Sequence, residues 1–520
     1  MQCVTKLVLH NFKKFKDFNV CFEEGVNTVV GDNESGKSTI LTAIELVASG
    51  SRSKVDAIGV ETLLTKDSIN DFFAGVQDFQ HLPIIRAELY LKQDTNPDLH
   101  GKHNSSGVAS SGLSMILQPN EELRSEIDSI LGAGLGNFPY EYYYTTFVTF
   151  SGEAYSGYRN FLKCLSIDSS KISNEYANKE YTRLVYNSSV NEVERARLKN
   201  EYRQCKESFK DNNLVALNSQ LGDYSFLVRT GVKSNLETDV VLAQDNIPLD
   251  ERGKGQQCFI KTDFALSRND GTRSVDILLL EEPENHLSHV NMKRLISRIS
   301  DVHQRQIIIA THSSMISSRL DLRKSVLISG YSNLAIKLDC LSNETAKFFM
   351  KAPDNYILEV ILSSKVILVE GDVEYMLIEE LYSQVSGATL SHDRIHVVSV
   401  GGTSFKRYME LAEKLDIRVA VIRDNDGDYQ SNCVDSYTEY VTDSIKVFSD
   451  QDDDRYTFEV CLYDDNKEIC DALFSGGKIK KSPLDYMLSN KTESAFRLLD
   501  TYSDELVVPE YIKRAIEWIR

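Results

Sequence analysis

The segment VNTVVGDNESGKSTI, residues 26–40, decides the fold of the N-terminal part of the chain. Apolar residues of β type, Val26 to Val30, lead into a loop with two glycines, and helical spacing begins at Ser38. The loop fits the template G-x-x-x-x-G-K-[ST] at every fixed position, between a strand and a helix as that template requires. The segment therefore predicts a phosphate-binding loop, with Lys37 on the β- and γ-phosphates and the Ser38 hydroxyl on Mg²⁺. We expect nucleotide contacts from Asn33, Gly36, Lys37, Ser38 and Thr39.

Two later apolar strands predict the rest of a nucleotide site. Residues 277–280 lead into Glu281 and Glu282, and residues 307–310 lead into a Thr-His pair that ends at His312. Neighbouring residues on a strand point to opposite faces, so one of these carboxylates can reach Mg²⁺ through water while the other orients the attacking water. Taken alone, the acidic stretch could be a solvent-exposed turn. Together with the phosphate loop, the two strands favour a nucleotide site.

A second α/β pattern begins after about residue 355. Strands that alternate with helices predict a parallel sheet with helices on its faces. The periodicity of this part predicts strands and helices in alternation: strands at 365–369, 395–400 and 418–422, and helices from Val373 and from Phe405.

Carboxylates follow two strands of this second pattern. Glu370 comes where the first strand ends and Glu374 about one helical turn later, so both can face one crevice at the carboxyl edge of the sheet. Asp424 and Asp426 follow the strand at 418–422, and on an extended backbone their side chains share a face. Converging carboxylates repel one another unless a divalent cation neutralises them, and oxygen ligands suit Mg²⁺ or Mn²⁺ rather than zinc. The stretch therefore predicts a divalent-metal site.

Two other interpretations of Asp424 and Asp426 stay open at this point. An Asp-x-Asp-x-Asp run also begins calcium loops of the EF-hand type, but that template needs Gly at the sixth position and Glu at the twelfth, where this chain has Tyr429 and Asp435. An acidic, solvated loop would need no ion at all. The apolar strand before the pair and the matching position of Glu370 favour the Mg²⁺ or Mn²⁺ site.

Composition limits the class of protein. The chain has 520 residues, 42% of them hydrophobic, and a mean hydropathy of −0.29, which is enough for about two to four compact domains. A net charge of −19 argues against general attraction to nucleic acid, although carboxylates that hold cations count as negative in that sum. The nine cysteines form no Cys-x-x-Cys pair, and no apolar run of about 18 residues or signal-peptide pattern occurs. We expect a reduced, cytoplasmic protein without a membrane partner.

The N-terminal motifs are similar to those of ABC-type ATPases of the RecF and SMC kind. The similar stretches are LVLHNFKKF at 7–15, the phosphate loop, Glu-Glu-Pro at 281–283 and Thr-His-Ser at 311–313. The resemblance implies that Glu281 is the metal-side carboxylate of the Walker B motif, Glu282 the catalytic glutamate and His312 the switch histidine near the γ-phosphate.

RGKGQQ at 252–257 stands in the place of the ABC signature, which in that class acts across a dimer on the partner's ATP. The resemblance implies that Gly253 and Gly255 contact nucleotide. The segment lacks the usual serine, however, and the stretch FVTFSGE at 147–153 contains no glutamine for a Q-loop. The resemblance thus supports ATP binding better than fast hydrolysis.

The C-terminal motifs resemble the Toprim domain shared by topoisomerases, primases and OLD (overcoming lysogenization defect) nucleases. In that family a strand-end glutamate and a later Asp-x-Asp bind metal, and VSVGGT at 398–403 between them also fits. The spacing of Glu370 and Glu374 and the position behind an ATPase favour OLD proteins. In those proteins a further carboxylate and a C-terminal lysine complete the site, which implies Glu459 and Lys491.

This resemblance covers nearly the whole chain and implies its fold class: α/β, with an ABC-type (RecF- and SMC-like) ATPase domain that carries a helical insertion, followed by a Toprim α/β domain. We expect the ATPase domain in 1–159 and 223–355. The helical insertion, or dimerisation element, is expected in 160–222, and the Toprim nuclease domain with C-terminal helices in 356–520.

The implied function is that of an ATP-binding, divalent-metal-dependent DNA endonuclease. Two Mg²⁺ or Mn²⁺ ions about 4 Å apart would activate water and stabilise the leaving oxygen, and Lys491 would offset transition-state charge. The expected metal ligands are Ser38 in the ATPase domain and Glu370, Glu374, Asp424, Asp426 and Glu459 in the Toprim domain. Catalytic roles are expected for Glu370, Asp424, Asp426 and Lys491, and for Glu282 in the ATPase.

The resemblance also implies partners. We expect DNA as substrate, at least a homodimer and, as in defence effectors of the Gabija and retron kind, a dedicated partner protein or nucleic acid. The alternative is an ATP-gated scaffold that binds DNA or a partner and whose Toprim domain does not cut.

Overall fold

The computed structural model falls into two compact units, Met1–Asn27 with Gly36–Thr311, and Thr28–Ser35 with His312–Arg520. The residues that the structure describes are 2–93, 96–134, 136–157, 161–169, 182–183, 185–186, 190–221, 224–229, 235–267, 275–301, 305–328, 335–339, 341–351, 356–402, 404–475 and 480–520. Thr403 of the VSVGGT stretch and parts of the expected insertion, among them residues 170–181, lie outside these ranges.

The first sheet of the N-terminal part is antiparallel. Its order is β2-β1-β4-β6-β5, with β7 paired to β6. Inward-facing residues of neighbouring strands lie opposite one another, as where Leu7 pairs with Val20 on one side and Leu89 on the other. The strands are β1 (Val4–Phe12), β2 (Phe15–Cys21), β4 (Ile85–Leu91), β5 (His100–Gly101), β6 (Ser110–Pro119) and β7 (Tyr143–Thr149).

A second sheet has the order β14-β13-β3-β12-β11-β8. Strands β8, β11 and β12 run parallel to one another, and β13 runs parallel to β3 and antiparallel to β14. The central strands are apolar almost throughout, as expected for parallel strands that are buried on both faces. The strands are β3 (Val26–Gly31), β8 (Cys164–Asp168), β11 (Ile277–Glu281), β12 (Gln306–Thr311), β13 (Ser325–Ile328) and β14 (Ala335–Lys337).

Helix α1 (Lys37–Ser49) packs against this second sheet, with contacts to β12, β11 and β8. Gly50 ends it in a left-handed conformation, with φ of 56°. The predicted order of strand, loop and helix around the phosphate loop is therefore confirmed.

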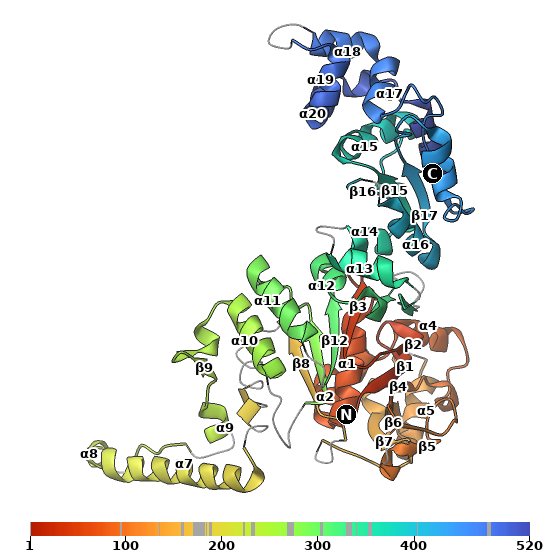
Figure 1. Cartoon of the computed structure of the whole chain (residues 1–520). Helices are drawn as coiled ribbons and strands as arrows, with labels where there is room; N and C mark the ends of the chain where they lie inside the picture. Colours follow the sequence, from red (N-terminus) through yellow and green to blue (C-terminus); the bar gives the residue numbers. More distant parts are fainter. Residues whose placement is uncertain are drawn as a thin grey trace. The chain divides into compact units, whose positions relative to one another are not determined.

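The helical insertion is shorter than expected at its N-terminal end. Residues 164–168 form strand β8, which pairs with β11, so they belong to the sheet. After them, α7 (Glu192–Asn213) begins at Asn191, whose side chain accepts the Glu194 N–H, and continues into α8 (Val215–Asn218) (Figure 1). The expected boundary at residue 160 is corrected to a position after Asp168.

Shorter elements complete the first unit. A two-stranded ribbon, β9 (Ala243–Gln244) and β10 (Ile247–Pro248), precedes α10 (Lys254–Ser267). Among the described residues, the other α-helices of this unit are α2 (Arg52–Ile58), α3 (Val60–Leu63), α4 (Lys66–Ala74), α5 (Arg124–Gly132), α9 (Leu236–Asp239) and α11 (His289–Ser300).

The second α/β pattern forms a parallel sheet with the order β16-β15-β17-β18. This confirms the predicted parallel sheet. Its strands are β15 (Lys365–Val369), β16 (Ile395–Ser399), β17 (Arg418–Ile422) and β18 (Ile445–Phe448). The α-helices of this unit are α12 (Ser314–Arg319), α13 (Asn343–Lys351), α14 (Ile357–Leu362), α15 (Asp372–Ser386), α16 (Phe405–Leu415), α17 (Phe458–Asp465), α18 (Lys467–Phe474), α19 (Pro483–Ser489), α20 (Lys491–Tyr502) and α21 (Glu510–Ile519).

Side chains of this parallel sheet contribute to two hydrophobic cores. One core gathers Ile367 and Ala420 with residues of α15, α17 and α21. The other gathers Val366 and Val419 with residues of α14 and α16, and it also contains Val30 of the strand before the phosphate loop. The end of that strand therefore belongs to the hydrophobic core of the second unit.

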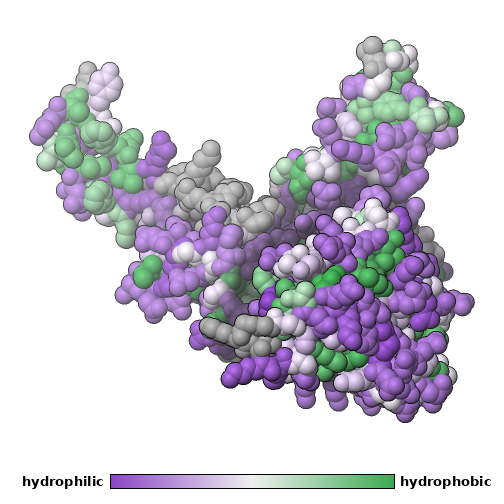
Figure 2. All heavy atoms as spheres, turned by 90° about the horizontal axis from the view of Figure 1, so that it is seen from above, coloured by the Kyte–Doolittle hydropathy of each residue, from purple (hydrophilic) through white to green (hydrophobic). Residues whose placement is uncertain are grey.

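The face shown in Figure 2 is mostly hydrophilic, with apolar side chains in separate groups. Exposed apolar residues occur on α7 and α8, among them Phe209 and Val215. Within the described ranges, no helix combines the length and the apolar character needed to cross a membrane.

Candidate functional site

The phosphate loop has the conformation that its template needs. Gly36 precedes α1 with φ of 107°, and a Cβ atom there would lie 2.3 Å from the Phe15 ring, so no other residue fits without a shift. Lys37 and Thr39 are buried, whereas Asn33 and Ser38 are exposed. The amides at the start of α1 and the Lys37 ammonium are anion-binding groups of the kind that hold phosphates.

The two acidic residues after β11 take different conformations. Glu281 is the last residue of the strand, whereas Glu282 has a positive φ of 45°. The expectation that an extended strand separates their side chains is therefore wrong for Glu282. Its carboxylate accepts a hydrogen bond from Asn285 Nδ2 at 2.7 Å, and its N–H donates to Ala310 of β12 at 2.8 Å. The turn after β11 and the neighbouring strand thus fix Glu282 in place.

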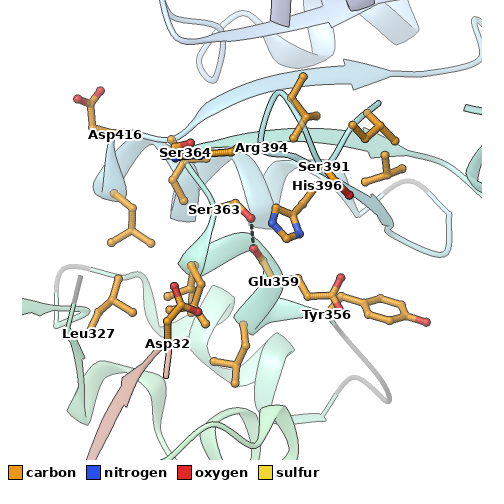
Figure 3. Close-up of a pocket in the computed structure, with 18 of the residues that line it drawn as sticks. Asp32, Leu327, Tyr356, Glu359, Ser363, Ser364, Ser391, Arg394, His396 and Asp416 are labelled. Carbon is orange, nitrogen blue, oxygen red and sulfur yellow. Dashed lines mark hydrogen bonds between the residues drawn. The ribbon is translucent and has the colours of Figure 1, made fainter. Parts of the chain in front are cut away.

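His312 follows β12 and lines a cavity of about 1400 Å³ that Asp32 of the phosphate loop also lines. Figure 3 shows Asp32 on one side of this cavity and Arg394 and Asp416 on the other. Two segments that were predicted for the nucleotide, the phosphate loop and His312, therefore meet at one cavity. The described residues that line it do not include Glu370, Glu374 or Asp424.

The segment 252–257, in the place of the ABC signature, contains one glycine that the packing around it requires. A Cβ atom at Gly255, in the first turn of α10, would lie 2.0 Å from the carbonyl oxygen of His286. At Gly253 nothing lies within 4 Å of the added Cβ position. Gly255 thus allows α10 to approach the loop after Glu282, and the expected contact of both glycines with a partner's nucleotide stays a prediction.

The metal candidates come from the carboxyl ends of two neighbouring strands and from two helix N-termini, and a third helix N-terminus carries Lys491. Glu370 follows β15, and Glu374 lies in the first turn of α15. Asp424 follows β17, the parallel neighbour of β15. Glu459 lies in the first turn of α17, and Lys491 is the first residue of α20. The sheet order therefore brings Glu370 and Asp424 to the same edge, as predicted.

Three of these carboxyl groups hold their protons unusually tightly. Burial raises the pKa of Asp424 to about 8, and the charges of Glu374, Glu370 and Glu459 add to this. Burial also raises the pKa of Glu374 to about 7, with contributions from Glu459 and Glu370. The pKa of Glu370 is raised by burial and by Asp426, against the effect of Arg423. The carboxylates are thus close enough to repel one another in a poorly solvated place.

Backbone N–H groups donate hydrogen bonds to two of these carboxylates. The Phe458 N–H donates to Asp424 Oδ1 at 2.8 Å, and the Gly371 N–H donates to Glu374 Oε2 at 3.2 Å. Glu370 Oε2, in contrast, is buried and has no hydrogen-bond partner, although the Asp424 backbone N–H lies near enough to the Glu370 carboxyl group to lower its pKa. A buried carboxylate oxygen without a donor is unfavourable unless a cation serves it.

Asp426 lies differently from the prediction. Its φ of 51° places it in the left-handed region, so the backbone after β17 is not extended and Asp424 and Asp426 do not share the face of a strand. Its half-exposed carboxylate lies 3.6 Å from Arg423 Nη2. Its charge still acts on Glu370, whose pKa it raises. Asp426 therefore lies near the site, but its role as a ligand stays a prediction.

Glu459 and Lys491 meet, although 32 residues separate them. Lys491 Nζ donates to Glu459 Oε2 at 2.9 Å, and the Glu459 side chain is only 4% exposed. Burial works against the charged form of Lys491, but the hydrogen bond to Glu459 and the charges of Glu459, Asp424 and Glu374 outweigh it and raise the pKa of Lys491. A cation in the first turn of a helix opposes the helix dipole, so the carboxylates account for this lysine better than helix stability does.

This donor set fits a divalent cation. Its members are oxygen ligands, three of them have raised pKa values, and Glu370 Oε2 has no donor of its own. As they lie, no three His, Cys, Asp or Glu side chains of the described chain are arranged to hold an ion.

The sequence interpretation did not include several residues that support the site. Arg423 donates from Nη1 to Tyr437 Oη at 2.6 Å and from its backbone to Phe448. Asn425 is buried, and its Nδ2 donates to the carbonyls of Asp450 and Asp452 at 3.0 and 2.8 Å. The sequence did offer a signal for Arg423 and Asn425, because both lie within the run RDND that contains the two predicted aspartates. The Phe458 amide was not, because every residue carries one.

Two family models match the chain. Residues 6–107 match an AAA domain, and residues 361–426 match the Toprim domain of overcoming lysogenization defect protein-like proteins. The first range includes the phosphate loop, and the second includes Glu370, Glu374, Asp424 and Asp426. No curated protein matches the chain.

Solved structures were also found to be similar. An SMC head domain from Thermotoga maritima is 14% identical, with 64% of this chain and 98% of that chain covered and a TM-score of 0.29. The C-terminal region of the Xanthomonas campestris pv. campestris OLD protein is 23% identical, with coverage of 30% and 94% and a TM-score of 0.24. The corresponding region from Burkholderia pseudomallei is 20% identical, with coverage of 30% and 97% and a TM-score of 0.22. TM-scores of this size do not establish a common arrangement, so we conclude nothing from them.

The strand topology and the two family matches confirm the expected fold class, an α/β ATPase followed by a Toprim α/β domain. They also place the predicted metal carboxylates of β15 and β17 inside the matched Toprim range. The chain therefore joins an ATPase domain to a Toprim domain of the OLD-like family.

Proposed function

We propose that the chain is an ATP-binding, divalent-metal-dependent DNA endonuclease. The observation that carries this proposal is the group of Glu370, Glu374 and Asp424, which the turn from β15 to α15 and the end of β17 bring to one sheet edge with raised pKa values. Such a group is unfavourable in the metal-free chain and becomes favourable with a cation bound. Raised carboxyl pKa values in one crevice are typical of functional sites.

Glu370, Glu374 and Asp424 would hold the cation, with Glu459 and Asp426 completing a second ion site. Bound Mg²⁺ or Mn²⁺ would supply an activated water and stabilise the leaving oxygen of a phosphodiester. Glu374 is buried and Asp424 is partly buried, which limits competing hydration of these carboxylates. Lys491, next to Glu459, would place a positive charge where negative charge grows on the phosphate.

The ATPase domain would control this cleavage. Lys37, Ser38 and the amides of the phosphate loop would hold ATP and its Mg²⁺, with Glu281 on the metal side. Glu282, held by Asn285, is suited to orient an attacking water. A nucleotide biases the cleaving state only by binding one conformation better than another, so ATP can act as activator or inhibitor.

We further propose that the substrate is DNA and that the chain acts as a homodimer or larger assembly in the cytoplasm, in antiviral defence with a dedicated partner. The net charge of −19 requires that DNA approach a local cationic site, which bound metal and Lys491 would provide. An ATP-gated scaffold whose Toprim domain does not cut is the second candidate. It is favoured by the ion pair between Arg423 and Asp426, which occupies a predicted ligand.

Cleavage of plasmid and oligonucleotide DNA by the purified chain separates the two candidates. We expect cutting with Mg²⁺ or Mn²⁺ and none with EDTA. Glu370→Gln or Asp424→Asn should lower the rate by about 1,000-fold or more, as for residues that act together in one catalytic unit, with ATP binding unchanged.

Asp428→Asn is the matched control, because Asp428 lies on the same loop, is exposed and caps only the Ser431 N–H. It should cut normally. Metal-dependent cutting that persists in both site variants would overturn the assignment, and DNA binding without any cutting by the unaltered chain would support the scaffold.

A further inference from the structure

The loop between β18 and α17, residues 449–457, lies against the segment that carries Asp424. The Phe458 N–H, at the end of this loop, donates to the Asp424 carboxylate at 2.8 Å. The Asp426 N–H donates to the carbonyl of Tyr456 at 3.1 Å, and Asn425 donates to two loop carbonyls. Three consecutive residues, 424–426, are thus fixed by this one loop.

One arginine side chain, that of Arg455, connects this loop to α17. Arg455 Nε donates to Asp450 at 2.8 Å, and Arg455 Nη2 donates to Asp465 at the end of α17, also at 2.8 Å. Asp464 lies 3.8 Å from Nη1. The side chain of Arg455 is 20% exposed, those of Asp450 and Asp465 are 19% and 25% exposed, and the hydrogen bond to Asp465 is the largest of the effects that raise the pKa of Arg455.

This geometry differs from that of a surface ion pair. The guanidinium bridges the start of the loop to the last turn of α17, the helix whose first turn carries Glu459. Loss of the arginine would leave two partly buried carboxylates without their cation, which is costly. A lysine at this position could replace it only in part, because an ammonium keeps the charge but cannot bridge two carboxylates in the fixed geometry of a guanidinium fork.

We propose that Arg455 is a positioning residue of the metal site: it fixes the loop that holds Asp424 and the helix that presents Glu459. This inference rests on the proposed function, because it concerns the same site. Residues that orient metal ligands without touching the ion typically change metal affinity by about 10- to 100-fold when they are replaced.

The test compares Arg455→Met and Arg455→Lys with the unaltered full chain. We expect calorimetric titration with Mn²⁺ to show about 10-fold or more weaker binding for Arg455→Met, with partial recovery in Arg455→Lys. Cleavage should need a correspondingly higher Mg²⁺ concentration for its half-maximal rate. In the metal-free chain, hydrogen exchange of the amides at 449–458 should become faster.

Arg418→Met is the matched control. Arg418 lies at the amino end of β17, donates to the Trp518 carbonyl and covers the Trp518 ring at 4.4 Å, so its loss should lower stability without changing metal affinity. Mn²⁺ affinity that stays unchanged in Arg455→Met, while the melting temperature falls as in Arg418→Met, would overturn the inference and leave the proposed function intact. Absence of Mn²⁺ binding in the unaltered chain would overturn both.

Discussion

Asp424 and Glu374 are the residues whose protonation the fold changes most clearly at this site. Their pKa values, about 8 and about 7, lie far above those of an unfolded chain, about 4. The folded state therefore keeps these protons to higher pH than the unfolded state. The resulting stability is fully present below about pH 4 and is lost as the pH rises through about 7 to 8.

A pH series tests this linkage. With EDTA, the melting temperature should fall between pH 5.5 and 8.5, and Mg²⁺ should raise it more at pH 8.5, because the deprotonated carboxylates bind the cation. Asp424→Asn should flatten this dependence. Identical pH profiles for the variant and the unaltered chain would show that Asp424 is not the group responsible.

Lys491 gives a second prediction at the residue scale. Lys491→Met leaves the buried Glu459 carboxylate without its ammonium partner and removes a charge from the site. We expect cleavage to fall by about 100-fold or more, the range for loss of one group that stabilises transition-state charge, with Lys491→Arg retaining part of the rate. Rates at saturating Mg²⁺ provide the measurement, and a normal rate in Lys491→Met would exclude the lysine from the chemistry.

At the scale of elements, the turn between β3 and α1 depends on one glycine. Gly36→Ala would force a side chain into a left-handed conformation, which costs about 1–2 kcal/mol, and its Cβ would also meet the Phe15 ring. We expect the variant to lose ATP binding in an equilibrium nucleotide titration.

Gly25→Ala separates the two causes. Gly25 also has a positive φ, of 82°, but nothing lies within 4 Å of an added Cβ. It should lower stability by the conformational cost alone and still bind ATP. Equal nucleotide affinities in the two variants would contradict a special role for the packing of Gly36 on Phe15.

The elements that sequence alone predicted well are those with a strong apolar signal. The predicted strands 365–369 and 418–422 agree with the bounds of β15 and β17, because buried parallel strands are apolar throughout. The expectation that Glu370 and Glu374 lie close together followed from the predicted turn between a strand and a helix. Long-range pairing was harder: β8 was assigned to the insertion, because only its pairing with β11 shows that it belongs to the sheet.

For the candidate site, too, the sequence predicted some features and missed others. Sequence placed Glu370 and Asp424 at strand ends, and the resemblance suggested the pair of Glu459 and Lys491. The sequence did not show the left-handed conformation of Asp426, because the prediction treated the residues after β17 as a continuation of the extended strand. Nor could the sequence show that the loop at 449–457 holds residues 424–426, because the loop makes these contacts through its backbone atoms, which leave no pattern in side-chain types.

At the scale of the whole molecule, the expected boundary at residue 356 divides a hydrophobic core. Leu322, Leu327 and Phe349 pack in the same core as Val366 and Phe405. A fragment of residues 356–520 would expose the core partners of these side chains to water, at about 25 cal/mol per Å² of apolar surface. We expect it to melt at a lower temperature, and to aggregate more, than a fragment of residues 312–520.

Scanning calorimetry and light scattering of the two fragments measure this difference. The longer fragment lacks only the β3 segment of its compact unit, so it should retain most of the packing. Equal melting temperatures for the two fragments would show that residues 312–355 add little to the stability of the Toprim part.

Val30, one residue before the phosphate loop, lies in the core that also backs the strand of Glu370. An exchange of only the C-terminal third between relatives would pack Val30 of one protein against core side chains of another. The strand before the loop and the parallel sheet of the Toprim part should consequently vary together over evolution, and a library of chimaeras should favour crossovers that transfer both.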